Sequence, residues 1–176
     1  HPTKNGELTP FDVGIGSHKK VWWKCNKGDD HEWQTITYHR NNGSGCVFCA
    51  NQQVGKSNSL AALYPDLVKE WHSIKNGDLT PFDLVSKSNK RVWWQCKDVI
   101  QHTYLMSPGE RLRGGGCSLC SGTIVDQTNC LATLNTELAE QWHPIKNGNF
   151  QPTDVTSVSG KKVWWKCDKG DDHEWE

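Results

Sequence analysis

A tandem repeat with a constant spacing of 71 residues constrains this chain more than any other feature. Cys25 recurs 71 residues later as Cys96 and again as Cys167. The same spacing holds, without insertion or deletion, for the paired tryptophans, the Lys-Asn-Gly triplets and the Cys-x-x-Cys pairs. A chain with such a period folds as an array of similar units rather than as one irregular domain.

The repeat divides the chain into three modules. We expect module 1 at residues 1–54 without a leading helix, a complete module 2 at residues 55–124, and module 3 at residues 125–176, which ends before its Cys-x-x-Cys. His1 matches His72 and His143, each of which directly follows a tryptophan. The chain is therefore expected to be a piece of a longer array.

The composition is polar but rich in tryptophan and cysteine. Hydrophobic residues make up 35% of the 176, yet there are 10 Trp and 8 Cys. Chains like this have small cores that a metal or a covalent bond must reinforce. No stretch reaches the roughly 20 apolar residues of a membrane-spanning helix, so we expect no membrane partner and a cytoplasmic location. The formal net charge of zero argues against a non-specific coat on nucleic acid.

Local patterns predict short elements and hence a small α+β fold in each module. The β-branched and aromatic residues 21–25 predict a strand, and residues 32–38 a second strand. The second copy of that second strand should be weaker, because it contains Pro108 and Gly109. Ser59 can cap a short helix over residues 60–63, and Pro65 suits the first turn of a helix that runs to Trp71. Residues 129–142 repeat this helical pattern without the proline.

The clearest chemical motif is a set of three cysteines and one histidine that occurs twice. The first set is Cys25-x5-His31-x14-Cys46-x2-Cys49, and the second is Cys96-x5-His102-x14-Cys117-x2-Cys120. Three thiolates and one imidazole suit tetrahedral Zn²⁺. Since four protein ligands leave no open position for water or substrate, the sequence predicts two structural zinc ions per chain.

Disulfides are the alternative use of these cysteines, because eight is an even number. Cys130 lies outside the pattern, where the preceding repeat has Ser59, and Cys167 has no Cys-x-x-Cys after it. The remaining six cysteines form two groups of three, so pairing within a module would leave one thiol over. A histidine at a fixed place in each group completes four ligands, which favours zinc.

Two other histidines are alternative candidates for zinc ligands, and the third copy of the motif is incomplete. His72 and His143 also recur, but each follows a helix end, where a histidine can cap carbonyl groups. In module 3, Cys167 and His173 form an incomplete metal site. Two ligands rarely hold a structural zinc ion, so we expect this site to stay empty unless another chain completes it.

The chain resembles a bacterial family of tandem treble-clef, or zinc-ribbon-like, modules of poorly defined function. The matching motifs are Glu70-Trp71-His72, Lys75-Asn76-Gly77-Asp78-Leu79-Thr80-Pro81, Val92-Trp93-Trp94-Gln95-Cys96 and Gly116-Cys117-Ser118-Leu119-Cys120-Ser121-Gly122. The resemblance implies arrays that are sometimes attached to nuclease-like domains, and hence DNA or RNA as partners. The chain departs from the family pattern at residues 97–105, and at Val47 and Ser118, where a proline is usual.

A candidate binding face follows from the alternation of side chains along a strand. If Val21, Trp23 and Cys25 face the zinc core, then Lys20, Trp22 and Lys24 face outward. The outward set and its copies, with two arginines at matched positions, are Lys20, Trp22, Lys24, Arg40, Arg91, Trp93, Arg111, Lys162, Trp164 and Lys166. Such cation–aromatic groups bind phosphates and stack on bases. The alternative is that both tryptophans of each pair simply pack in a core.

The sequence argues against an enzyme. It has no phosphate-binding loop, no open metal position and no nucleophile in a recognisable setting, and the recurring Asp12, Asp83 and Asp154 look like turn or cap residues. Two classes of function remain. The first is an array that binds nucleic acid or targets an effector domain, and the second is a protein-interaction or spacer array.

Overall fold

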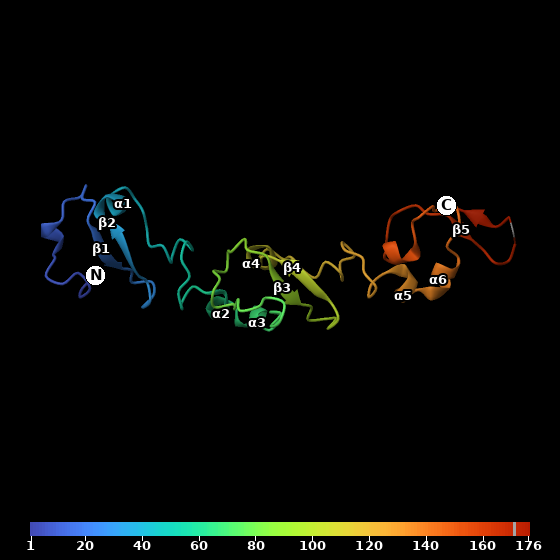
Figure 1. Ribbon diagram of the computed structural model, residues 1–176, viewed down its shortest axis with the longest axis horizontal. Coiled ribbons are helices and arrows are strands. Elements are labelled where there is room, and N and C mark those ends of the chain that lie inside the picture. The colour runs from blue at the N-terminus through green and yellow to red at the C-terminus, as the bar shows by residue number, and fades with distance from the viewer. Residues whose placement is uncertain (171) are drawn as a thin grey trace. The chain divides into compact units, whose positions relative to one another are not determined.

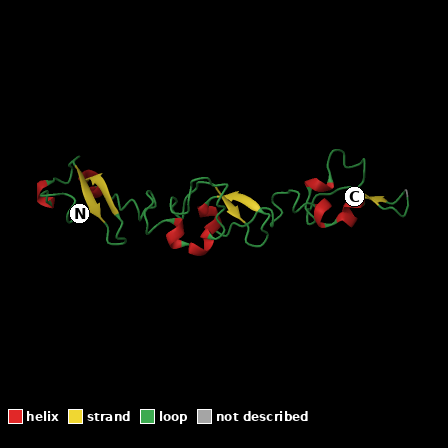
Figure 2. Ribbon diagram, turned by 60° about the horizontal axis from the view of Figure 1, so that its bottom comes forward, coloured by secondary structure: helices red, strands yellow, loops and turns green. Residues whose placement is uncertain are grey.

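The computed structural model describes residues 1–170 and 172–176, and its regular elements are short (Figure 1). The strands are β1 (Lys20–Lys24), β2 (Glu32–Ile36), β3 (Val92–Gln95), β4 (Thr103–Met106), β5 (Trp165–Lys166) and β6 (Glu174–Trp175). The helices are α1 (Thr37–Asn41), α2 (Leu60–Leu63), α3 (Pro65–Val68), α4 (Pro108–Leu112), α5 (Leu131–Leu134) and α6 (Thr136–Glu140), with 3-10 turns η1 (Pro10–Asp12) and η2 (Pro152–Asp154). Figure 2 shows that loops make up most of the chain between them. The expected α+β architecture of short hairpins and short helices is confirmed.

Each module contributes one two-stranded sheet. β1 pairs with β2 in antiparallel register, with Trp23 opposite Trp33. β3 pairs with β4, and β5 pairs antiparallel with β6 so that Trp165 lies opposite Trp175. The second tryptophan of each recurring pair therefore lies in the first strand of a hairpin, two residues before the first cysteine of the metal motif.

The second strand of each hairpin ends where a helix begins. β2 stops at Ile36, so the expectation that it continues to Tyr38 is wrong, because Thr37 starts α1. β4 is one residue shorter than β2, as Pro108 suggested. In α4 the Ser107 hydroxyl accepts from the Glu110 backbone N–H, and the Glu110 carboxylate accepts from the Ser107 N–H at 2.9 Å. This capping box fixes the helix start.

The leading segments of modules 2 and 3 each form two single-turn helices. Ser59 caps α2 by accepting from the Ala62 N–H, as its position predicts. α3 ends at Val68, so the prediction of a helix that runs to Trp71 is wrong; the chain turns after Val68, and Trp71 is extended. Among the residues described, no helix is long and apolar enough to cross a membrane.

Packing divides the chain into two units that cut across the repeat. One unit contains residues 1–92 and 106–113, and the other contains residues 93–105 and 114–176. Each unit thus contains one complete metal motif together with the leading helices of the following repeat. The module boundaries after residues 54 and 124 stay a prediction about independent folding.

Small aromatic clusters form the cores. In module 1 the buried residues Trp33, Cys46 and Phe48 pack with Trp23, Cys25 and Val47. In module 3 the buried residues Leu131, Trp142, Val155 and Val163 pack with Leu138, Ala139, Phe150 and Trp165. The alternation expected for the tryptophan pair is clearest in β3, where Trp94 is 0% exposed and Trp93 is half-buried. In β1 both members of the pair are half-buried.

This contrast in β3 generates a matched prediction. Trp94→Ala should lower the free energy of unfolding by about 3–5 kcal/mol, because it removes a wholly buried aromatic side chain. Trp93→Ala should cost about 1 kcal/mol, as expected for a half-buried side chain. Urea titration of the zinc-loaded variants, followed by circular dichroism, measures both values. Equal losses would mean that the two tryptophans share one core.

Candidate metal centres

Two groups of one histidine and three cysteines converge, one in each packing unit. They are Cys25, His31, Cys46 and Cys49, and Cys96, His102, Cys117 and Cys120. In each group the four ligand atoms all lie within 4.8 Å of one another. These are the ligand sets that the spacing of the two sequence motifs predicts.

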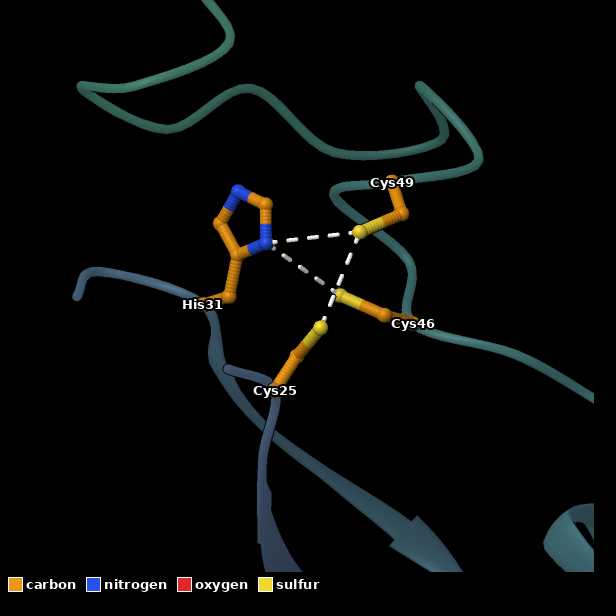
Figure 3. Close-up of side chains that lie close together, drawn as sticks. All are labelled: Cys25, His31, Cys46 and Cys49. Atoms are coloured by element: carbon orange, nitrogen blue, oxygen red, sulfur yellow. Dashed lines mark hydrogen bonds between the residues drawn. The ribbon is translucent and has the colours of Figure 1, made fainter. Parts of the chain in front are cut away.

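The distances fit a tetrahedral zinc ion. Zn–S bonds of about 2.3 Å and Zn–N bonds of about 2.05 Å give a tetrahedron with S···S edges of about 3.8 Å and S···N edges of about 3.6 Å. The Cys25 and Cys49 sulfurs lie 3.7 Å apart, and the Nδ1 atom of His31 lies 3.5 Å from the Cys49 sulfur. Figure 3 shows Nδ1 and the three sulfurs turned toward one another. In the second group the corresponding distances are 3.6 Å between Cys96 and Cys120 and 3.2 Å between His102 and Cys120.

A tight backbone turn positions the first two ligands. The Cys25 N–H donates to the His31 carbonyl at 3.0 Å, and the His31 N–H donates to the Gly28 carbonyl at 3.1 Å. A Cβ atom on Gly28 would lie 2.8 Å from the His31 ring and 2.9 Å from the Ser57 hydroxyl. Glycine therefore allows both the imidazole and the linker to approach this turn.

A second layer of contacts orients the His31 imidazole. Nδ1 faces the sulfurs, while Nε2 lies 3.0 Å from the Ser57 hydroxyl. The Ser57 N–H donates to the Asp30 carboxylate at 3.1 Å, and Phe48 stacks on the imidazole with ring centroids 5.1 Å apart. Such a partner on the other ring nitrogen fixes the tautomer that presents a lone pair to the metal. Sequence reasoning missed Ser57, whose counterpart is Thr128.

The second centre differs from the first in the residues around its histidine and in the linker that follows. Val99 stands where module 1 has Gly28. There Thr128 turns to the Asp126 carboxylate, which accepts from its hydroxyl at 2.5 Å. That hydroxyl holds the pKa of Asp126 below its ordinary value, with the nearby His102 adding to the effect.

An asparagine ties each Cys-x-x-Cys turn to the next repeat. The Asn58 side-chain amide donates to the carbonyls of Phe48 and Gln53, and its oxygen accepts from the Gly55 N–H. Asn129 makes the same donations to Leu119 and Ile124. Both asparagines are buried, and α2 and α5 begin two residues later. Since Asn58 and Asn129 are 71 residues apart, their recurrence with the repeat is the sequence signal from which a structural role could have been predicted.

The thiol pKa values within a tetrad diverge before a metal ion binds. The Lys27 backbone N–H, followed by the His31 side chain, lowers the pKa of Cys25 to about 7. Burial, followed by contacts with the other thiols, raises the pKa of Cys49 to about 11 and that of Cys120 to about 12. Thiols with such high pKa values keep their protons at neutral pH, so Zn²⁺ has to displace them.

The third copy forms the same turn with only two ligands. The Cys167 N–H donates to the His173 carbonyl at 2.9 Å, and the His173 N–H donates to the Gly170 carbonyl at 3.1 Å. Among residues 1–170 and 172–176, no third metal-ligating group joins this pair within one cluster. The incomplete site therefore keeps the backbone turn of the two complete centres.

The competing histidines have a different role. The Nε2 atom of His143 lies 3.0 Å from Glu174, while its Nδ1 accepts from the backbone N–H groups of Ile145 and Lys146. His1 lies in the same way 2.9 Å from Glu32. His72 likewise accepts through Nδ1 from the backbone N–H groups of Ile74 and Lys75. These three histidines order the turns that follow them and lie outside both tetrads.

The outward residues of the hairpins lie among fixed ionic contacts. In module 1 the Lys4 ammonium lies 4.6 Å from the centre of the Trp22 ring, and both Lys4 and Lys24 contact Glu32, at 2.5 and 3.4 Å. Lys20 is exposed beside them. Sequence reasoning used Lys4 only as part of a recurring Lys-Asn-Gly triplet and missed that it lies over the tryptophan.

Module 3 repeats this arrangement, and module 2 differs in sequence. Lys146 lies 4.2 Å from the Trp164 ring centre and contacts Glu174, while Lys166 lies 3.8 Å from Glu174 and Lys162 lies 3.8 Å from Glu176. In module 2 the half-buried Trp93 follows the exposed Arg91, and Thr103 stands where the other modules have glutamate.

The two arginines do not extend this outward face as expected. Arg111 binds the Glu70 carboxylate with one nitrogen, at 2.8 and 2.7 Å from its two oxygens. Arg40 lies over the rings of Trp23 and Trp33, with centroid distances of 5.1 and 5.6 Å. Both side chains therefore hold neighbouring elements together.

Comparison with known proteins agrees with this geometry. A family model described as "Probable Treble clef zinc finger domain" matches the chain three times, over residues 1–52, 67–123 and 138–176. No curated protein matches the chain. The three matches correspond to the three copies of the repeat.

The two tetrads predict a zinc content of two per chain. Metal analysis of the purified protein should give about two equivalents, because each set of four ligands closes one tetrahedral site. Cys96→Ser should remove one equivalent and leave the site at Cys25 loaded. Loss of both ions from this variant would show that the two packing units fold as one cooperative body.

The thiol pKa values predict proton release on zinc binding. At pH 7 the Cys49 and Cys120 thiols, with pKa values of about 11 and 12, are protonated, so loading both sites should release at least two protons per chain. Calorimetry in buffers of different ionisation enthalpy measures this number. The apparent zinc affinity should also fall as the pH is lowered. A binding enthalpy that does not depend on the buffer would contradict the prediction.

Proposed function

The chain belongs to the family of probable treble clef zinc finger domains, and we propose that it is a structural-zinc array that binds nucleic acid. Each tetrad supplies four protein ligands, so zinc holds the module together and leaves no coordination position for a substrate. In this proposal DNA is the favoured ligand, and the array targets an attached effector domain to it.

The observation that carries the proposal is a lysine held beside an outward tryptophan. Lys4 lies 4.6 Å from the Trp22 ring centre, and Lys146 lies 4.2 Å from that of Trp164. In this position an ammonium group can bind a phosphate oxygen while the exposed part of the indole stacks on a base. The arrangement recurs in module 3, so modules 1 and 3 each offer one such pair to a nucleic acid.

The local charge around these tryptophans also supports the proposal. In module 1 Lys4 lies over Trp22, Lys20 and Lys24 stand two residues before and after it in β1, and Glu32 contacts Lys4 and Lys24, so these four charged side chains sum to +2. The whole chain has a formal net charge of zero. The positive charge needed for phosphate binding is thus local and does not depend on the overall balance.

A protein-interaction array is the second candidate, favoured by a different observation. Several apolar side chains at matched repeat positions are exposed: Phe11 and Phe82 are 99% and 66% exposed, and Ile74 and Ile145 are 82% and 79% exposed. Exposed apolar residues of this kind contribute to protein interfaces when they gather into a patch.

A salt titration separates the two candidates. Binding of the zinc-loaded chain to a fluorescent oligonucleotide should weaken steeply with salt, because each phosphate contact adds about −0.7 to −0.9 to the slope of log affinity against log salt. Lys20→Gln should reduce this slope by about one such step. Absence of binding at about 50 mM salt would favour the protein-interaction array.

The tryptophan contribution has its own test and control. Trp22→Ala should weaken oligonucleotide binding by about 1–3 kcal/mol if the indole stacks on a base. Phe11→Ala, which removes an exposed aromatic ring away from the Lys4–Trp22 pair, should leave binding unchanged. Both variants should retain two zinc equivalents. Equal effects of the two substitutions would contradict a specific role for Trp22.

A further inference from the structure

The two metal centres hold their histidines differently, although their ligand sets are the same. In the first centre Nδ1 of His31 faces the sulfurs, and Nε2 lies on the other side of the ring (Figure 3). The Ser57 hydroxyl lies 3.0 Å from this Nε2 atom. When Nδ1 gives its lone pair to a metal ion, Nε2 carries the proton and donates a hydrogen bond to the hydroxyl oxygen. Ser57 therefore holds the ring in its ligating orientation.

Other residues pack closely around the His31 ring. Phe48 stacks on it with an interplanar angle of 12°. A Cβ atom on Gly28 would lie 2.9 Å from Nε2 and 2.9 Å from the Ser57 hydroxyl. The Ser57 N–H in turn donates to the Asp30 carboxylate at 3.1 Å. The outer side of His31 is thus filled by protein atoms, and the hydroxyl that supports the ring is itself fixed.

The His102 ring in the second centre lacks both the stacked ring and the hydroxyl partner. Leu119 and Thr128 stand where the first centre has the aromatic ring and the serine. The N–H and the hydroxyl of Thr128 both donate to the Asp126 carboxylate, at 2.7 and 2.5 Å. Within the described residues 1–170 and 172–176, Nε2 of His102 forms no hydrogen bond, although this histidine is only 5% exposed.

A cavity of about 450 Å³ lies beside the second centre. Two of the four ligands, His102 and Cys120, contribute to its lining together with Leu134 and Val158. The last two side chains are 58% and 82% exposed, so the cavity opens to solvent. Exposure of a thiol alone does not distinguish the centres, because Cys49 is exposed as well. The second centre differs in that a molecule in this cavity can contact a ligating sulfur and the imidazole together.

We propose that the second centre is a zinc exchange site and that Ser57 is the positioning residue that makes the first centre retain its ion. A small metal-binding molecule enters the cavity and approaches the second centre beside Cys120, while the unsupported His102 ring turns away. Each bond from the ion to a protein ligand is replaced by a bond to the incoming molecule. The ion stays Zn²⁺, and the freed thiolates take up protons from water. This inference goes beyond nucleic-acid binding and does not depend on it.

A chelator challenge of the full zinc-loaded chain tests the proposal. In excess EDTA one zinc equivalent should be lost at least about tenfold faster than the other, because contacts to a ligating histidine change metal affinity by about 10–100-fold. A short pulse of N-ethylmaleimide followed by peptide mass spectrometry identifies the freed thiols. Cys117 and Cys120 should be labelled in the fast phase, and Cys46 and Cys49 in the slow phase. The fast rate should rise with the EDTA concentration.

Substitution of Ser57 tests its positioning role. Ser57→Ala should speed release from the first centre by about tenfold and leave the rate of the second centre unchanged. Thr128→Ala is the matched control, which should leave release from the second centre unchanged because this hydroxyl bonds to Asp126. Ser59→Ala removes the cap of α2 and controls for a general loss of stability in the same linker. All variants should hold two zinc equivalents before the challenge.

Phe48→Leu provides a second test that does not depend on the folding of the Ser57 variant. It gives the first centre the residue that the second centre has at Leu119, so it should also speed release from the first centre. Equal release rates for the two centres of the parent chain, or faster release from the first, would overturn the proposal. So would a Ser57→Ala chain that releases zinc no faster than the parent. A fast rate that does not depend on EDTA concentration would contradict entry through the cavity.

Discussion

The convergence of three thiolates and one imidazole is the constraint on which each module depends. A chain with 35% hydrophobic residues and elements of two to five residues cannot bury enough surface to fix a hairpin against a loop. Zinc coordination joins the turn after β1, which carries Cys25 and His31, to the turn that carries Cys46 and Cys49. A closed site of this kind contributes on the order of 10 kcal/mol to folding, more than the small aromatic cluster around Trp33 can supply.

Hydrogen bonds around the first metal centre connect it to the beginning of the next repeat. The Ser57 hydroxyl lies 3.0 Å from Nε2 of His31. The side-chain amide of the neighbouring Asn58, two residues before α2 begins, donates to the Phe48 carbonyl within the Cys-x-x-Cys turn. Asn129 makes the same hydrogen bond, to the Leu119 carbonyl, before α5 begins. A repeat unit defined by sequence is therefore not a packing unit, because the metal-binding turns of one module form hydrogen bonds with the residues that directly precede the leading helices of the next.

Lys4, in the first Lys-Asn-Gly triplet, contacts both the outward tryptophan of module 1 and a glutamate of the same hairpin. Asn5 accepts from and donates to the backbone of Trp22, which places Lys4 over the indole ring and near Glu32. The outward tryptophan thus has a packing partner of its own, which explains part of its recurrence without any ligand. The exposed part of the ring and the lysines beside it are the features on which the proposed nucleic-acid binding rests.

The repeat, the ligand sets and the turn residues were determined by the sequence, because each depends on residue type at a fixed spacing. Cys25-x5-His31 with a later Cys-x-x-Cys specifies a tetrahedral site wherever the chain can close on itself, and Ser59 caps the helix it precedes. Spacing does not reveal which polar groups meet across loops. The pairing of Arg111 with Glu70, 41 residues apart, and of Ser57 with His31 depends on tertiary packing. The early end of α3 at Val68 has the same cause: Trp71 forms an isolated β-bridge in the folded chain, which helical periodicity alone could not predict.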